Sequence, residues 1–283
     1  MNKIITCIDG SSITQSVTDA GTWAAKKLNK TICFLHTIEK EQQHGADDFS
    51  GTIGLGTRSS LLEEMTKLDE QKGKIALQLG QELLEFVASS AKNSGIEHVE
   101  SLQRHGDVVD AILDIEKDSQ LIVIGRSGLQ HDGNFKVLGS HIETLLRKSA
   151  QPVLIVPNTF TAPKSFMIAY DGRASADRAL QKVLNSGLLA GVNCHLVSVK
   201  NNEAALISKF DNAKARLTEK GFNVTTAFLK GSINEALMTY QKDNNIELVI
   251  MGAFGHSKIR QFFVGSNTIK MLEQTHIPLI VLR

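Results

Sequence analysis

The stretch Val249-Ile-Met-Gly-Ala-Phe-Gly-His-Ser-Lys-Ile-Arg-Gln-Phe-Phe-Val-Gly-Ser-Asn-Thr268 runs from apolar residues through spaced glycines into a helical pattern. Its apolar run ends at Met251, glycines stand at positions 252, 255 and 265, and apolar residues recur at helical spacing after Ser266. This order predicts a strand, a glycine-containing loop and the N-terminus of a helix. Glycines let backbone N–H groups approach an anion, and a helix start adds unpaired donors and the positive end of its dipole. The stretch therefore predicts a phosphate site.

The same alternation of short apolar strands and helices extends outward along the whole chain and occurs twice. The strand patterns lie at 3–8, 31–38, 99–104, 121–124 and 153–156, and again at 166–170, 194–199, 224–229, 248–251 and 279–282. Near-continuous apolar strands that alternate with helices are typical of a parallel sheet covered on both faces. The sequence therefore predicts an α/β fold made of two tandem copies of one unit.

A proline-bearing segment separates the two copies. We expect a first domain over residues 1–157, a linker over 158–165 and a second domain over 166–283. The copies differ most at about 39–60, where the first carries a polar insertion, and a long helical pattern follows at 59–93. No strand directly precedes the insertion's segment Gly51-Thr-Ile-Gly-Leu-Gly56. We interpret it as a flexible insertion, with a lid over the first site as the alternative.

In each copy, a change of winding direction at the first strand would place a site at the carboxyl ends of strands one and four. Asp9 and Asp171 stand at the ends of the two first strands, and the glycine segments follow the two fourth strands. We expect Ser11 and Ser12 to cap the helix that follows Asp9. A helix cap is also the alternative to ligand binding for Asp171.

The composition excludes several classes of protein. A formal charge of +1 over 283 residues, with 5% aromatic residues and no basic stripe, argues against a nucleic-acid partner. Cys7, Cys33 and Cys194 lie in apolar runs without disulfide or zinc spacing, and no histidine pair has metal-ligand spacing, so we expect buried thiols and no metal site. No apolar segment approaches the roughly 18 residues of a membrane span, and the N-terminus carries no signal-peptide cleavage pattern. We expect a cytoplasmic protein without membrane insertion.

The second copy resembles a universal stress protein domain, which belongs to the adenine-nucleotide alpha-hydrolase-like (Rossmann-like) type. ATP-binding members of that family carry G-x2-G-x9-G-[S/T] after the fourth strand, and Gly252, Gly255, Gly265 and Ser266 match it. Asp171 matches the family's acid after the first strand, and the likeness covers the chain as a tandem pair. The resemblance implies two three-layer α/β/α domains, each with a five-stranded parallel sheet of order 3-2-1-4-5.

The resemblance also implies a ligand for the second copy: ATP, or AMP or ADP, with Mg²⁺ accompanying the phosphates. Asp171 and Val199 would hold the adenine and ribose, and Met251 and Gly252 would line the ribose side. The phosphates would be received by Gly255, His256, Gly265, Ser266 and Asn267. The implied function is a nucleotide-dependent sensor or regulator in the stress response. No residue is assigned a catalytic role, because the sequence offers no convincing general base.

The first copy departs from the motif. Ten residues, not nine, separate its second and third glycines, and Asp132 lies among them. An acid there would repel a triphosphate, and Arg126 would partly offset that repulsion. The corresponding site is therefore the weaker candidate. Its residues are Asp9, Gly125, Gly128, Gly139 and Ser140.

Two further functions stay open from the sequence. One is a slow ATPase or adenylating enzyme of the same superfamily, and the other is a nucleotide-free scaffold for a protein or small ligand. The resemblance implies that residues 153–156 and 279–282 pair within one chain as a pseudo-dimer. It also allows a homodimer of whole chains, and it names no protein partner.

Overall fold

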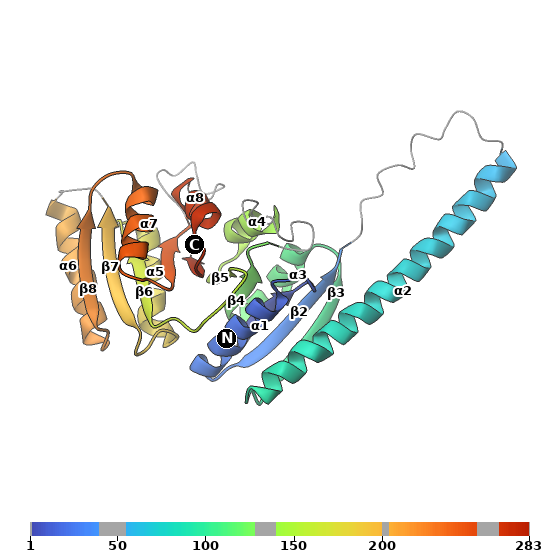
Figure 1. The fold of residues 1–283 in the computed structure, drawn as a ribbon, viewed down its shortest axis with the longest axis horizontal. Helices are drawn as coiled ribbons and strands as arrows, with labels where there is room; N and C mark the ends of the chain where they lie inside the picture. Colours follow the sequence, from blue (N-terminus) through green and yellow to red (C-terminus); the bar gives the residue numbers. More distant parts are fainter. Residues whose placement is uncertain (1, 40–54, 128–139, 200–203, 254–265, 283) are drawn as a thin grey trace.

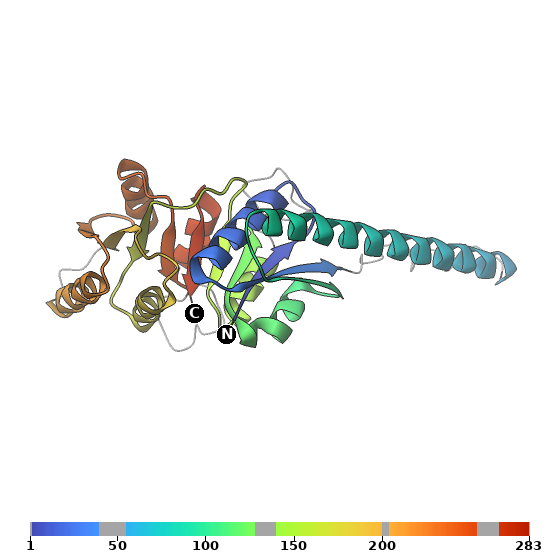
Figure 2. The same ribbon diagram turned by 90° about the horizontal axis from the view of Figure 1, so that it is seen from below.

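A computed structural model describes residues 2–39, 55–127, 140–199, 204–253 and 266–282. In these residues it shows one ten-stranded sheet with helices on both faces, and a single long helix that extends away from the body (Figures 1 and 2). None of the described helices has both the length and the apolarity needed to cross a bilayer.

The elements follow the predicted alternation in both copies. The N-terminal half contains β1 (Lys3–Ile8), α1 (Thr14–Leu28), β2 (Thr31–Ile38), α2 (Leu55–Asn93), β3 (Val99–His105), α3 (Val108–Ile115), the 3-10 helix η2 (Glu116–Asp118), β4 (Ser119–Gly125), α4 (Ser140–Lys148) and β5 (Val153–Val156). The C-terminal half contains β6 (Ser165–Ala169), α5 (Ala174–Ser186), β7 (Asn193–Val199), α6 (Ala204–Glu219), β8 (Val224–Leu229), α7 (Ile233–Asp243), β9 (Val249–Gly252), α8 (Ser266–Gln274) and β10 (Leu279–Leu282).

The strand order of the sheet is β3-β2-β1-β4-β5-β10-β9-β6-β7-β8. Each half is parallel within itself and has the order 3-2-1-4-5, which confirms the predicted fold. The halves join through β5 and β10, which pair antiparallel with Ile155 opposite Leu279 and Val153 opposite Val281. This is the pairing within one chain that the resemblance implied.

Two hydrophobic cores lie on opposite faces of this sheet. Side chains alternate along each strand, so Ile4 belongs to one core and Ile5 to the other, and both are buried. The first core receives residues of α1, α2, α5 and α6, and the second receives residues of α3, α4, α7 and α8. Because the β5–β10 join makes one sheet, each core runs across both halves.

The three cysteines lie in this interior, as predicted. Cys7, Cys33 and Cys194 are free thiols and are buried. Burial raises the pKa of all three thiols, to about 12 for Cys194. At neutral pH they remain protonated and contribute to packing instead of nucleophilic chemistry.

The start of α1 differs from the expectation that Ser11 and Ser12 cap it. The helix begins at Thr14, and its N-cap residue, Ile13, supplies no side-chain hydrogen bond. The hydroxyl and the backbone N–H of Ser11 instead donate to Asp9 Oδ1, at 2.6 and 3.0 Å. The carboxylate competes for the serine hydroxyl and forms a local turn, and the helix starts after it.

Helix α2 is 39 residues long and begins four residues before the predicted boundary. Only its C-terminal part packs on the sheet, where Leu84 and Val87 are buried. Gly80 makes the closest approach, because a Cβ there would lie 2.6 Å from His36 Nδ1 and even closer to Gln103 Nε2. The N-terminal part extends beyond the edge of the sheet (Figure 1).

Candidate functional site

The C-terminal candidate site consists of the end of β9, the start of α8 and the residues that follow β6 and β7. Met251 is buried and Gly252 ends β9. The Thr268 hydroxyl donates to the Gly252 carbonyl at 3.2 Å, so the first turn of α8 is tied to the end of the strand. Ser266 and Asn267 begin that turn with exposed side chains. The unpaired N–H groups and the positive dipole end of α8 therefore lie beside the carboxyl end of β9.

Close packing explains why residue 252 is glycine. A Cβ at this position would lie 2.7 Å from Ser175 Cβ and 3.0 Å from the Ser175 backbone carbon. Ser175 belongs to the first turn of α5, so only a residue without a side chain lets that helix approach β9. This glycine brings the starts of α5 and α8 to the end of one strand.

Asp171 is the second residue beyond the end of β6, and its side chain is exposed. Its Oδ1 accepts the N–H of Arg173 at 3.1 Å, and its Oδ2 lies 3.2 Å from the Arg173 guanidinium. The N-cap of α5 is Arg173, so the alternative role of Asp171 as that helix's cap is wrong. Gly172 adopts φ +70°, and its carbonyl accepts a 2.7 Å hydrogen bond from Lys209 of α6. Val199 ends the neighbouring strand β7 and is half-buried.

Several predicted site residues lie outside the described part of the chain. They are Gly255, His256 and Gly265 in the second copy and Gly128 and Gly139 in the first. Residues 40–54 of the insertion, with the first four residues of the Gly51–Gly56 segment, also lie outside it, whereas Leu55 and Gly56 begin α2. Their predicted roles stay predictions.

The N-terminal candidate site has the same backbone plan. Gly125 ends β4, Ser140 begins α4, and Asp9 lies directly after β1. A Cβ at Gly125 would meet Ile13 Cγ2 at 3.2 Å and Val17 Cγ2 at 3.3 Å, so the packing of α1 here is looser than that of α5 at Gly252. The two sites match in topology and differ in side chains.

Arg126 does not contribute to the N-terminal site as expected. Its side chain is 4% exposed and reaches across the join to the C-terminal end of α8. There its guanidinium donates to the backbone carbonyls of Glu273, at 2.5 Å, and Thr275. A cation at a helix C-terminus satisfies carbonyls that have no partner within the helix and interacts favourably with the helix dipole. Arg126 therefore holds the halves together and offers no charge to a nucleotide.

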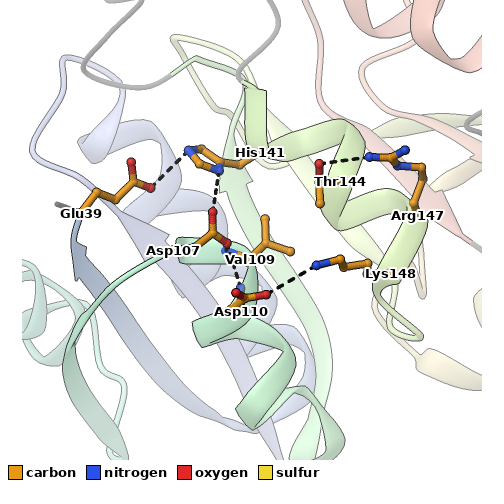
Figure 3. A network of polar contacts seen from close by, with 8 residues as sticks. All are labelled: Glu39, Asp107, Val109, Asp110, His141, Thr144, Arg147 and Lys148. Carbon is orange, nitrogen blue, oxygen red and sulfur yellow. Dashed lines mark hydrogen bonds and ion pairs between the residues drawn. The ribbon is translucent and has the colours of Figure 1, made fainter. Parts of the chain in front are cut away.

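Three side chains that the sequence analysis did not connect meet in the N-terminal site (Figure 3). The imidazole of His141, in the first turn of α4, lies between two carboxylates. Its Nε2 is 3.2 Å from Glu39 Oε1, and its Nδ1 is 3.4 Å from Asp107 Oδ2. Asp107 also caps α3, because its Oδ1 accepts the N–H groups of Val109 and Asp110 at 2.8 and 3.0 Å. We call Glu39, Asp107 and His141 the acid–histidine trio.

The acid–histidine trio changes the electrostatics at the start of α4. Each residue offers one atom that can ligate a metal, a carboxylate oxygen or an imidazole nitrogen, and these atoms lie within 4.8 Å of one another. At this separation the three groups could share a divalent ion. Without an ion, the trio places the carboxylate of Asp107 where the second copy has an uncharged serine. It also places the carboxylate of Glu39 directly after β2, whereas Lys200 directly follows the corresponding strand β7. Asn267 corresponds to His141, and Ser232 corresponds to Asp107. A phosphate at α4 would meet repulsion that a phosphate at α8 does not meet.

Sequence spacing alone could not reveal the trio, because its members are far apart in the chain. The positions of the three residues relative to the predicted strands and helices could have indicated that they meet. Glu39 directly follows β2, Asp107 directly precedes α3, and His141 lies in the first turn of α4. Carboxyl ends of parallel strands meet at one edge of a sheet, so residues in these positions converge.

Comparison with known proteins agrees with this fold. The chain matches the universal stress protein family over residues 1–157 and 198–283. The chain belongs to the universal stress protein family. Universal stress protein Slr1230 of Synechocystis sp. is 33% identical over 287 residues, covering 100% of both chains. The structure of a universal stress protein from Archaeoglobus fulgidus aligns with a TM-score of 0.73 at 21% identity, covering 100% of this chain and 98% of that one, which shows the shared fold.

One of the matched structures covers less than half of this chain. A universal stress protein solved in complex with cAMP covers 44% of this chain at 16% identity, with a TM-score of 0.37. Asp171 lies between the two matched segments of this chain, whereas Gly252, Ser266 and Asn267 lie inside the second. The family match thus includes the glycine motif of the second copy.

Proposed function

We propose that this universal stress protein binds an adenine nucleotide, ATP in the first place, in its C-terminal half. The glycine motif from Gly252 to Ser266 carries the proposal, because its spacing fits phosphate binding between a strand and a helix start. The described geometry supports it: Gly252 is packed too tightly for a side chain, and Thr268 anchors the first turn of α8 to the same strand end.

Each residue's role follows from its chemistry. Ser266 and Asn267 would donate hydrogen bonds to phosphate oxygens at the positive end of α8, while Asp171 and Val199 would flank the adenine and ribose. The side chains that begin α8 offer uncharged oxygens and no carboxylate. Mg²⁺ would therefore be held by the phosphate oxygens of ATP. AMP and ADP are the alternative ligands, and because they carry fewer phosphates their binding would depend less on Mg²⁺.

The biological role that fits these features is regulation. We propose a cytoplasmic protein of two domains, 1–157 and 166–283 with a linker at 158–165, whose nucleotide occupancy signals stress to a partner. Catalysis requires a base near the phosphates, and Asp171, a described carboxylate of the site, is already ion-paired with Arg173. Any ATPase activity would be slow.

A matched pair of substitutions tests the proposal by titration calorimetry with ATP. Ser266→Asp adds a negative charge at the start of α8 and is expected to weaken ATP binding about tenfold or more. Ser140→Asp makes the same change at the start of α4 and is expected to leave ATP binding unchanged. Loss of binding in both variants, or in neither, would contradict a site at α8. Gly255→Val and Gly265→Val should abolish binding as well.

A further inference from the structure

Helix α2 exposes a row of large apolar side chains that begins on the part extending beyond the sheet and continues on the outward face of the part that packs on the sheet. Leu68, Ile75, Leu79 and Phe86 are 57%, 58%, 60% and 62% exposed. In a monomer these apolar side chains would lie in water, and several large apolar side chains exposed along one face of a helix indicate an interaction site. The face of α2 that packs on the body is a different one, formed by Gly80, Leu84 and Val87.

The row has the spacing of a coiled-coil seam. Its positions are Leu68, Lys72, Ile75, Leu79, Glu82 and Phe86, which follow one another at intervals of four and three residues. A 4-3 repeat keeps one stripe of a helix facing a second helix. Two charges, Lys72 and Glu82, lie within the stripe, and both side chains are exposed. A helix that offers the opposite charge at each of these positions would fit the stripe best.

A second copy of α2 meets this requirement in one orientation. When two copies run antiparallel with Lys72 opposite the partner's Glu82, Ile75 lies opposite the partner's Leu79. The same alignment places Leu68 opposite the partner's Phe86. Parallel copies in register would instead oppose Lys72 with itself and Glu82 with itself, which repel. The stripe is thus self-complementary about a two-fold axis near position 77.

Residues that flank the stripe also suit this alignment. Near the two-fold axis, Gln78 would face the partner's Gln78 and Ala76 would face the partner's Ala76, so no like charges oppose each other there. The acidic side chains Glu63 and Glu70 point elsewhere, to Lys67 and Lys74 on the same helix, at 3.0 and 2.7 Å. Both pairs lie outside the stripe.

We propose that the outward face of α2 over residues 68–86 is a dimerisation element that binds a second copy of this chain as an antiparallel two-stranded coiled coil. The apolar positions 68, 75, 79 and 86 supply the buried surface. Lys72 and Glu82 set the orientation and register, as polar residues within a seam do in coiled coils. This interface is separate from the β5–β10 join, which lies within one chain.

Charge reversal tests the proposal on the full-length protein by sedimentation equilibrium or by light scattering after size-exclusion chromatography. Lys72→Glu and Glu82→Lys, made singly, each create two like-charge oppositions and are expected to weaken dimerisation at least tenfold. The double variant Lys72→Glu/Glu82→Lys restores both opposite pairs and should dimerise like the wild type. Circular dichroism checks that α2 remains helical in each variant.

The control is Lys67→Glu with Glu63→Lys, which exchanges charges outside the stripe and should leave the dimer unchanged. A monomeric wild type at tens of micromolar protein would overturn the proposal. The proposal would also be overturned if the double variant dimerised as weakly as the single variants. In that case Lys72 does not pair with the partner's Glu82 in the dimer that forms. A dimer that persists in all variants would place the interface elsewhere.

Discussion

The two halves of this chain present the same backbone site with different charges. In both, a glycine ends the fourth strand and a serine begins the following helix. At α8 the next side chain is the uncharged Asn267, whereas at α4 His141 lies between the carboxylates of Glu39 and Asp107. In both halves the topology places a helix N-terminus beside the end of the fourth strand, an arrangement that suits phosphate. The charges of side chains on neighbouring segments determine whether a bound anion would be attracted or repelled there. We propose on this basis that the second copy keeps a ligand site and that the first does not.

The join between the halves shows a second asymmetry. The backbone is symmetric there, since the N–H of Arg126 donates to Val156 O at 2.9 Å and the N–H of Ala253 donates to Leu282 O at 2.6 Å. The side chains are not, because only Arg126 is long enough to reach the helix of the opposite half. The chain therefore stabilises the C-terminal end of α8 from the N-terminal half, with no equivalent contact from Ala253.

Substitution of the two strand-ending glycines should give the largest difference in stability between equivalent changes in the two halves. Gly252→Ala places a Cβ 2.7 Å from Ser175 and forces α5 to shift, so we expect a loss of about 2–3 kcal/mol in the free energy of unfolding. Gly125→Ala meets two side-chain methyl groups at 3.2 and 3.3 Å and the Ser127 carbonyl oxygen at 3.2 Å. All three contacts are longer than those at Gly252, so the substitution should cost about 1 kcal/mol or less. Urea unfolding of both variants measures the difference. Equal losses would contradict the unequal packing.

Removal of the Arg126 side-chain contacts should have the next largest effect. Arg126→Met keeps the aliphatic volume and leaves the carbonyls of Glu273 and Thr275 without their donor. We expect a loss of about 2 kcal/mol in the free energy of unfolding. Thermal unfolding checks this, and Arg147→Met, an exchange on α4, serves as the control. An unchanged melting temperature for Arg126→Met would show that the join does not depend on this residue.

Neutralising the carboxylates of the acid–histidine trio should have a smaller effect, on ligand binding. Asp107→Asn keeps a good N-cap for α3, and Glu39→Gln keeps the side chain's size. In a Ser266→Asp background, the double substitution is expected to tighten ATP binding at the N-terminal site about three- to tenfold, because roughly 1 kcal/mol of repulsion is removed. Titration calorimetry measures it. Unchanged affinity would mean that another feature of the first copy excludes the nucleotide.

The sequence was sufficient for the architecture because its signals are local. Near-continuous apolar strands, as at Ile4 and Ile5, which are buried on opposite faces, and the repeated order of strands and helices indicate a parallel sheet covered on both faces. The glycine at position 252 was expected from the motif to let the backbone approach a phosphate, and that role stays a prediction. The structure adds a second reason for glycine there, the close approach of α5 at Ser175. Even the pairing of the last strands followed from the family resemblance.

The features that the sequence did not reveal depend on contacts between distant segments. Ser11 was expected to cap α1, but a carboxylate two residues earlier takes its hydroxyl. Arg126 was expected beside a nucleotide, but the antiparallel join places the end of α8 within its reach. His141 lacks any metal-like spacing in the chain and meets its two acids only after three elements converge. Local patterns predict elements, whereas these pairings follow from the assembled sheet.

The most direct test of the central claim is the identity and stoichiometry of the nucleotide released from freshly purified protein. Mass spectrometry after denaturation should detect one adenine nucleotide per chain in the wild type and in Ser140→Asp, and little or none in Ser266→Asp. Absence of any nucleotide from wild-type protein that also fails to bind added ATP would contradict the account. So would a nucleotide that remains in Ser266→Asp and is lost in Ser140→Asp.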